Sequence, residues 1–319
     1  MSFGARFALR LHGLERAVRE ARPADTTKGF DMSWRSALLR SVNGVIGAAG
    51  WQLQPRSFDF DDRLESPTHL AAMHGAMAAQ IAPWLERQTL FVAKPLPDLT
   101  AEIATFYAAF LDSPFRRQLG ESRYNNCLWL HLLARSIEPD LIIDSGTYTG
   151  ASSWALSRGA PAAKVASFDI DLSNLKLRLP TVTYVEADWT TFDLAPYAGK
   201  KILVYFDDHV DQARRLLEAR ARGIPLAIFD DDFTLGAFPA MAHDGAALPK
   251  VEFVLDETLR DGDEIVWRNR GQLARWRIDR GYLDRARAAV RATERVPSTS
   301  LVTGIHQTPY RIVSLHHDG

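Results

Sequence analysis

Hydrophobic positions in the first third of the chain recur at helical spacing, and the pattern changes near Pro139. Apolar residues three or four positions apart, with polar residues between them, predict amphipathic helices. The helices expected here cover residues 3–18, 34–49, 67–85, 98–111 and 122–136. The first of them is basic, so it either packs on its own domain or lies on a membrane surface.

After Pro139, short apolar runs alternate with helical or loop segments, which predicts βαβ units and a mostly parallel sheet. The fold class expected from this region is α/β and doubly wound. The five strands expected first cover residues 141–143, 165–168, 182–185, 202–206 and 226–229. Two later runs, 251–255 and 264–268, predict further strands, and residues 279–296 predict a final helix rich in arginine.

Composition excludes several classes of protein. The 319 residues include 38 Lys and Arg against 39 Asp and Glu, and a net charge of −1 argues against bulk binding of nucleic acid. A single cysteine, Cys127, excludes an internal disulfide framework and a cysteine-cluster metal site. No apolar run is long enough for an integral membrane span, and the N-terminus lacks a secretory signal pattern. A cytoplasmic location is therefore expected.

Each of the five expected strands is followed at once, or almost at once, by an aspartate. These residues are Asp144, Asp169, Asp188, Asp207 and Asp230. Ligands of open α/β sheets bind outside the carboxyl ends of the strands, near the reversal of strand order. The sequence therefore predicts a ligand site at one edge of the sheet, lined by these acids.

The first strand leads into the turn Asp144-Ser145-Gly146-Thr147-Tyr148-Thr149-Gly150. Glycine permits a tight turn and a close approach of ligand to backbone, and the helix that follows offers free N–H groups. The glycine spacing differs from the dinucleotide fingerprint G-x-G-x-x-G, and no Gly-Lys-Ser/Thr of a P-loop follows.

The run Gly-Thr-Tyr-Thr-Gly-Ala-Ser-Ser-Trp-Ala-Leu after an Asp-terminated strand resembles motif I of class I S-adenosylmethionine-dependent methyltransferases. The branch that it resembles most contains the catechol and caffeoyl-CoA O-methyltransferases, over roughly residues 120 to 270. The resemblance implies a doubly wound, Rossmann-like methyltransferase sheet with a helical N-terminal region. We expect a helical cap or substrate region over 1–120, the methyltransferase domain over 121–278, and a C-terminal helix and tail over 279–319.

The resemblance also implies how S-adenosylmethionine would bind. The methionine part would be surrounded by Asp144, Gly146, Thr147, Tyr148 and Gly150. Asp169 would accept hydrogen bonds from the ribose hydroxyls. Asp188 would lie beside the adenine, with Trp189 stacking on it. A Rossmann-like fold that uses another nucleotide is the competing interpretation.

Two further segments, Asp207-Asp208-His209 and Asp230-Asp231-Asp232, carry more acid than a cofactor site needs. Neighbouring carboxylates repel, so such a cluster takes up protons, turns into water or binds a cation. Oxygen ligands favour Mg²⁺, Ca²⁺ or Mn²⁺. The resemblance to metal-dependent O-methyltransferases implies Asp207, Asp230 and Asp231 as ligands of Mg²⁺ or another divalent cation. Asp-rich loops also cap helices, and Asp232 is expected to be solvated.

The proton acceptor is less clearly marked. The catechol branch places a catalytic lysine three residues after its first acid, where Val210 stands here. Related sugar and antibiotic methyltransferases use a histidine near this point, which implies His209 as the base. Asp208, acting through water, is the alternative. The sequence thus predicts metal-assisted O-methylation of a small-molecule or sugar hydroxyl.

Other interpretations of the sequence remain open. The chain could be a metal-free methyltransferase, a metal-dependent hydrolase or hydroxylase on the same fold, or a non-catalytic module that docks through its arginine-rich ends. The sequence does not decide whether the chain is a monomer or forms a homo-oligomer.

Overall fold

A computed structural model describes residues 42, 65–116, 123–241, 247–269 and 272–316. The chain divides into two compact units, 1–57 and 58–319, and the elements described below belong to the second. The helix expected over 3–18 lies outside the described residues, as does all but Val42 of the helix expected over 34–49.

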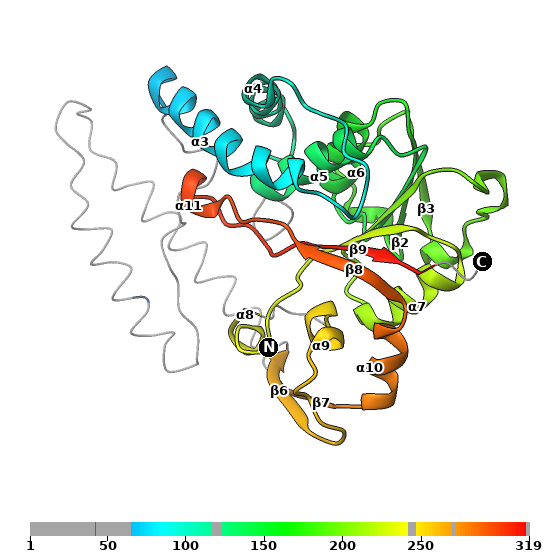
Figure 1. Cartoon of the computed structure of the whole chain (residues 1–319). Coiled ribbons are helices and arrows are strands. Elements are labelled where there is room, and N and C mark those ends of the chain that lie inside the picture. Colours follow the sequence, from blue (N-terminus) through cyan, green and yellow to red (C-terminus); the bar gives the residue numbers. More distant parts are fainter. Residues whose placement is uncertain (1–41, 43–64, 117–122, 242–246, 270–271, 317–319) are drawn as a thin grey trace, which may run out of the picture. The chain divides into compact units, whose positions relative to one another are not determined.

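A sheet of seven strands forms the centre of this unit (Figure 1), in the order β3-β2-β1-β4-β5-β9-β8. The first five strands are parallel to one another, whereas β9 runs antiparallel to both β5 and β8. The strands are β1 (Leu141–Ser145), β2 (Lys164–Asp169), β3 (Val182–Glu186), β4 (Ile202–Phe206), β5 (Leu226–Phe229), β8 (Val290–Arg295) and β9 (Arg311–Leu315). The order reverses between β1 and β4, which confirms the doubly wound α/β fold.

Helices cover both faces of the sheet, so the unit has three layers (Figure 1). One face carries α3 (Pro67–Glu86), α4 (Leu99–Leu111), α5 (Tyr124–Ile137) and α6 (Ala151–Gly159). The other carries α7 (Gln212–Ala221), α8 (Phe238–Met241), α9 (Val251–Leu255) and α10 (Arg280–Arg287). The shorter elements are η2 (Leu172–Asn174), η3 (Trp189–Thr191), η4 (Ala195–Tyr197), α11 (Ser300–Thr303) and the hairpin β6 (Glu264–Asn269) and β7 (Gln272–Arg277).

The continuous apolar runs of the strands follow from burial on both faces. Successive side chains of a strand point to opposite faces; Ile142 therefore packs into the core under α3–α6, and Ile143 into the core that α7 and α10 cover. Side-chain oxygens of Ser66, Asp98 and Asp211 cap the first turns of α3, α4 and α7, and satisfy N–H groups that the helices leave without a partner.

Two expected elements were wrong. Residues 251–255 form a short buried helix, α9, and not a strand, because a brief apolar run fits either element once it is buried. The helix expected over 279–296 ends at Arg287, and residues 290–295 form β8, which pairs with β9. The sheet therefore extends beyond residue 278, where the sequence predicted the sheet-bearing domain to end.

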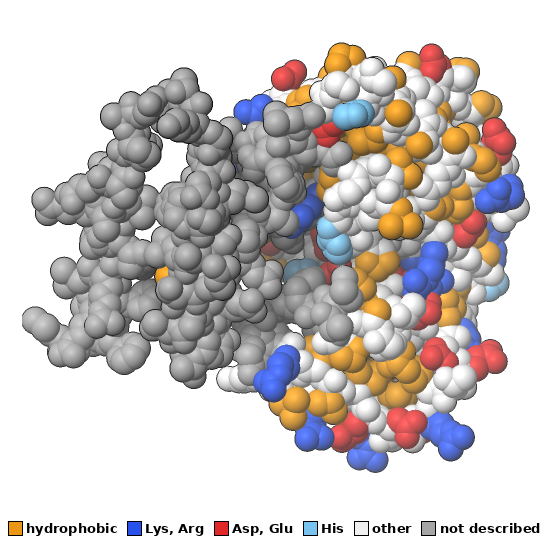
Figure 2. Space-filling model, turned by 90° about the vertical axis from the view of Figure 1, so that its left-hand side faces the viewer, with side chains coloured by type: hydrophobic (Ala, Val, Ile, Leu, Met, Phe, Trp, Pro, Cys, Tyr) orange, Lys and Arg blue, Asp and Glu red, His pale blue; other side chains and the backbone are white. Residues whose placement is uncertain are grey.

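The surface of the described residues mixes side-chain types. On the face shown in Figure 2, hydrophobic and charged side chains are interspersed over the described residues. Among the helices that the structure describes, none has both the length and the apolar composition to cross a bilayer.

Candidate functional site

The carboxyl ends of the five parallel strands meet at one edge of the sheet, and backbone hydrogen bonds continue past the strand ends. The Asp207 N–H donates to the Ser145 carbonyl at 2.8 Å, and the Asp230 N–H donates to the Phe206 carbonyl at 3.0 Å. The loops after β1, β4 and β5 are therefore held side by side. This is the point where strand order reverses, which is the usual ligand position in such sheets.

The turn after β1 requires glycine at both residue 146 and residue 150. Gly146 has φ +103°, and a Cβ there would lie 2.4 Å from the Asp207 carbonyl oxygen. Gly150 has φ +90°, and a Cβ there would lie 2.8 Å from Leu175. Tyr148, also at positive φ, is about half exposed at the tip of the turn. The turn thus presents backbone at the edge and leads directly into α6.

Asp144 lies beneath this turn and not at the edge. It is fully buried, and its Oδ2 accepts hydrogen bonds from Ser152 (3.0 Å), Ser153 (2.5 Å) and Ser167 (2.9 Å). Burial raises the pKa of the Asp144 carboxyl to about 6, although the three serine bonds act in the opposite direction. Thr147 is buried as well and shares a hydrogen bond of 2.5 Å with Ser167. Both residues support the turn from below.

Asp169, at the end of β2, faces the same turn. Its Oδ2 accepts the Tyr148 N–H at 2.7 Å, and its Oδ1 accepts the Asp171 N–H at 3.1 Å. The carboxylate is half-buried at the edge of the sheet, beside the backbone of the turn. Of the expected cofactor residues, Asp169, Tyr148, Gly146 and Gly150 are therefore gathered in one place.

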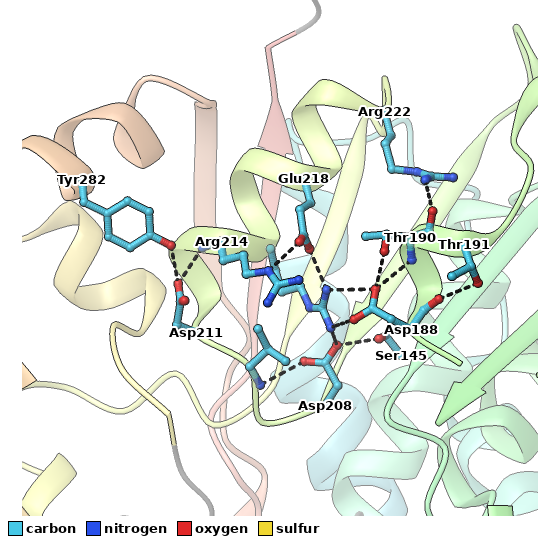
Figure 3. Close-up of polar contacts among 12 residues, drawn as sticks. Ser145, Asp188, Thr190, Thr191, Asp208, Asp211, Arg214, Glu218, Arg222 and Tyr282 are labelled. Atoms are coloured by element: carbon cyan, nitrogen blue, oxygen red, sulfur yellow. Dashed lines mark hydrogen bonds and ion pairs between the residues drawn. The ribbon is translucent and has the colours of Figure 1, made fainter. Parts of the chain in front are cut away.

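Asp188 belongs to a buried ion network that also includes Asp208 (Figure 3). Arg215, whose side chain is 2% exposed, places its Nη2 at 2.8 Å from Asp188 and 2.7 Å from Asp208. Its Nη1 contacts Glu218 at 2.6 Å. Burial raises the pKa of Asp188, but hydrogen bonds from Arg215 and Thr190 outweigh burial and bring it to about 2. Arg215 thus fixes the ends of β3 and β4 to each other.

Asp208 is occupied by donors. Besides Arg215, it accepts a hydrogen bond from the Ser145 hydroxyl at 2.5 Å and from the Val210 N–H at 3.2 Å. Three donors therefore occupy this carboxylate, and the geometry supports Asp208 as a residue that holds the loop after β4. Its expected role as a base through water stays a prediction.

Trp189 does not line an open pocket. Its side chain is completely buried, in edge contact with Phe206 at 5.4 Å between ring centroids, and the Arg222 guanidinium lies over its ring at 5.1 Å. No face of the indole is available for stacking on an adenine. The sequence showed an aromatic residue beside an acid, but η3 turns the ring into the core.

The acids after β4 and β5 form a candidate metal centre. Ligand atoms of Asp207, His209 and Asp231 lie within 4.8 Å of one another. His209 Nε2 is 3.9 Å from Asp207 Oδ1, and both His209 and Asp231 have positive φ. Two carboxylates and an imidazole suit a divalent cation. Of the three expected ligands, Asp207 and Asp231 belong to this group, which also contains His209, whereas Asp230 does not belong to it.

Asp230 points into the protein. Its Oδ2 accepts the Tyr205 hydroxyl at 3.0 Å, and its Oδ1 accepts hydrogen bonds from the Thr308 hydroxyl and, at 2.6 Å, the Asp231 N–H. Burial, followed by the neighbouring charges of Asp230 and Asp231, raises the pKa of Asp207 well above its usual range. Burial likewise raises the pKa of Asp230, with Asp231 adding to the effect. The cluster therefore holds carboxyls that favour a proton or a cation.

Asp232 is buried and not solvated, contrary to expectation. Its Oδ2 pairs with the Arg311 Nε, and its Oδ1 accepts the Glu252 N–H at 2.7 Å. Arg311 comes from β9, which the sequence did not predict as a strand. Asp232 thus connects the loop after β5 to the antiparallel strand and to α9.

The strand-end acids enclose a small hollow of about 10 Å³, close to the least space that one water molecule needs. It is lined by Asp207, Asp208, His209, Asp230, Asp231, Gln212 and Lys250, with Phe206 and Val210. No sequence pattern marked Lys250, Gln212 or Arg215 as functional residues. Lys250 belongs to no sequence motif. Arg215 is one of four arginines in and just after α7, so its sequence does not distinguish it from the other three.

Comparisons with known proteins give likenesses of structure. No family model matches the chain, and no curated protein matches it. Similar solved structures include the O-methyltransferase TomG from Streptomyces achromogenes with SAM (14% identity, 74% of this chain and 96% of that chain, TM-score 0.35). A SAH-bound methyltransferase from Podospora anserina has 14% identity over 76% and 96% of the two chains, with TM-score 0.35. An O-methyltransferase from Bacillus cereus with SAH has 13% identity over 76% and 99%, with TM-score 0.34. These values establish neither a family nor an activity.

Proposed function

We propose that this protein is an S-adenosylmethionine-dependent methyltransferase that methylates a hydroxyl oxygen of a small molecule or sugar with the help of a divalent cation. The observation that carries the proposal is the arrangement at one sheet edge. The turn Gly146–Gly150 and Asp169 lie at the ends of β1 and β2, and the group Asp207, His209 and Asp231 lies at the adjoining ends of β4 and β5. A cofactor and an acceptor bound there would be neighbours.

The cofactor half of the edge offers the groups that S-adenosylmethionine needs. Backbone at Gly146 and Gly150 permits close approach, and Asp169 is a carboxylate suited to two vicinal ribose hydroxyls. Asp144 and Thr147 hold the turn from below, and Asp188 marks the end of β3 where the adenine would lie. When bound, S-adenosylmethionine supplies an electrophilic methyl group on sulfur.

The acceptor half fits a divalent cation such as Mg²⁺. Asp207, His209 and Asp231 would hold it, with Asp230 behind them, and their donor atoms are close enough to share one ion. Such an ion lowers the pKa of a hydroxyl that binds beside it. The raised pKa of Asp207 agrees with a carboxyl that gains from a cation.

In this arrangement the proton acceptor would be His209 or a water molecule beside it. Its side chain is 43% exposed and can exchange a proton with solvent, whereas Asp208 is held by Arg215. Asp207 Oδ1, 3.9 Å from the His209 Nε2, is the group that would orient the ring. A His209 nitrogen that binds a cation cannot also accept a proton, so the base is either the other ring nitrogen or a water molecule.

Calorimetric titration with S-adenosylmethionine and S-adenosylhomocysteine tests the proposal. We expect binding at one site, loss of binding in Asp169→Ala, and binding close to wild type in Asp207→Asn. Transfer of labelled methyl groups to a panel of sugar and small-molecule hydroxyls should fail in Asp207→Asn and after EDTA treatment. Full turnover in EDTA would remove the cation from the mechanism, and absence of cofactor binding would favour a hydrolase or hydroxylase.

A further inference from the structure

Lys250 is a buried lysine beside the acid cluster. The residue is 2% exposed, and it lines the same hollow as Asp207, His209 and Asp231. Among the described residues, no hydrogen bond or ion pair is found for its ammonium. Burial of a charged group is costly unless charges of opposite sign compensate it. The carboxylates that line the hollow are the groups that can do so, and Lys250 lowers the pKa of Asp207.

The backbone on both sides of Lys250 is fastened to the ends of β5 and α7. The Gln212 N–H donates to the Pro249 carbonyl at 2.9 Å, and the Gln212 Oε1 accepts the Val251 N–H at 2.8 Å. The Gln212 Nε2 donates to the Asp230 carbonyl at 2.6 Å. Gln212 therefore binds both neighbours of Lys250, Pro249 through its backbone N–H and Val251 through its side chain, and its side chain also binds the start of the acidic loop. The backbone at the lysine is thus held at the hollow.

Two other acids in the loops after β4 and β5 are paired with arginines outside the hollow. Asp208 pairs with Arg215 at 2.7 Å, and Asp232 pairs with Arg311. His306 lies near Asp231, but burial lowers its pKa, which favours the neutral ring.

Asp207, Asp230 and Asp231 line the hollow, and among the described residues that line it Lys250 is the permanently basic side chain beside them.

We propose that Lys250 is the built-in cation of this site: its positive charge offsets part of the negative charge of the carboxylates before a divalent ion binds, and it limits how tightly that ion is held. The inference rests on the metal-assisted function proposed above. A positive charge fixed beside an ion repels it, so the lysine lowers affinity for a divalent ion.

Titration of the full-length protein with Mn²⁺ alone, followed by calorimetry or by the electron paramagnetic resonance of free Mn²⁺, tests this inference. Lys250→Met removes the charge and keeps most of the side-chain volume, and we expect its Mn²⁺ affinity to rise at least tenfold. Lys250→Arg keeps the charge and should stay within about threefold of wild type. Lys201→Met is the matched control, since Lys201 precedes β4 at the other end of the sheet and donates to the Ile137 carbonyl; it should leave Mn²⁺ affinity unchanged.

The melting temperature with and without Mn²⁺ is a second measurement, which tests the inference even if a variant is less stable. Lys250→Gln and Lys250→Met should lower the melting temperature without metal, and Mn²⁺ should raise it more than in wild type. Unchanged or weaker Mn²⁺ affinity in a folded Lys250→Met protein would overturn the inference and leave the methyltransferase proposal intact. Absence of Mn²⁺ binding by every variant would overturn both this inference and the metal centre, while titration with S-adenosylmethionine tests cofactor binding separately.

Discussion

Arg215 offers the sharpest test of how the sheet edge is held together. Its guanidinium is buried and joins Asp188 at 2.8 Å, Asp208 at 2.7 Å and Glu218 at 2.6 Å. Arg215→Met would keep the apolar part of the side chain and remove the charge. Asp208, 14% exposed, would then be an ionised carboxylate without its cation. Removal of one partner of a buried pair costs roughly 3 to 5 kcal/mol, so we expect a loss of about that size in the free energy of unfolding.

The neighbouring arginine is the matched control. Arg214 contacts the same Glu218 at 2.6 Å, but its side chain is 53% exposed. Exposed pairs four residues apart on a helix contribute about 0.3 to 0.5 kcal/mol, so Arg214→Met should cost no more than that. Urea denaturation at pH 7 followed by circular dichroism measures both variants. A loss below 1 kcal/mol in Arg215→Met, or equal losses in the two variants, would refute the reasoning.

The same network predicts a dependence on acid. The folded pKa of Asp188 is lowered from 3.8 to about 2, because the hydrogen bonds from Arg215 and Thr190 outweigh the effect of burial. A lowered carboxyl pKa stabilises the folded state above the unfolded pKa, and this contribution disappears as pH falls from about 4 to 2. It amounts to at most about 2 kcal/mol, since solvent partly screens Asp188. Arg215→Met should lose most of this acid dependence, whereas Arg214→Met should keep it.

Three further predictions concern the turn after β1 and its surroundings. Gly146→Ala should unfold the protein or cost more than about 3 kcal/mol in a denaturant titration, because its Cβ would meet the Asp207 carbonyl at 2.4 Å. Gly199→Ala, also at positive φ but with no atom within 4 Å of the added Cβ, should cost about 1 kcal/mol; equal costs would contradict the packing of the turn. The pKa of Asp144 is raised by burial from 3.8 to about 6, so the wild type loses stability as pH rises from 4 to 7. The free energy of urea unfolding of Asp144→Asn minus that of the wild type should therefore increase by up to about 3 kcal/mol between those pH values. A constant difference would count against a raised pKa. Trp189→Phe should lower stability in the same assay but leave the calorimetric affinity for S-adenosylmethionine within about twofold of wild type. A large loss of affinity would indicate that the indole contacts the cofactor.

Local patterns were sufficient for the parts of the site that follow from strand geometry. Apolar runs ending in aspartate predicted β1, β2, β4 and β5, and parallel pairing then brings their ends to one edge. The positive φ of Gly146 and Gly150 agrees with the expected tight turn. These features are local in sequence, so a single chain is enough to predict them.

Contacts between distant segments could not be predicted in this way. Whether Asp230 points outward or toward Tyr205 and Thr308 depends on a loop about 80 residues away. The ion pair of Asp232 requires Arg311 from β9, and β9 belongs to the sheet because it pairs with β5 and β8. Trp189 shows the same limit, since the direction of its ring is set by packing on Phe206.

Cofactor affinity is the measurement that decides between the proposed methyl transfer and every other use of this sheet edge. Calorimetry should show one molecule of S-adenosylmethionine per chain, with binding abolished by Asp169→Ala and retained in Asp231→Asn. No heat of binding at millimolar cofactor, or equal affinity in wild type and Asp169→Ala, would contradict the assignment of the Gly146–Gly150 turn and Asp169 to the cofactor.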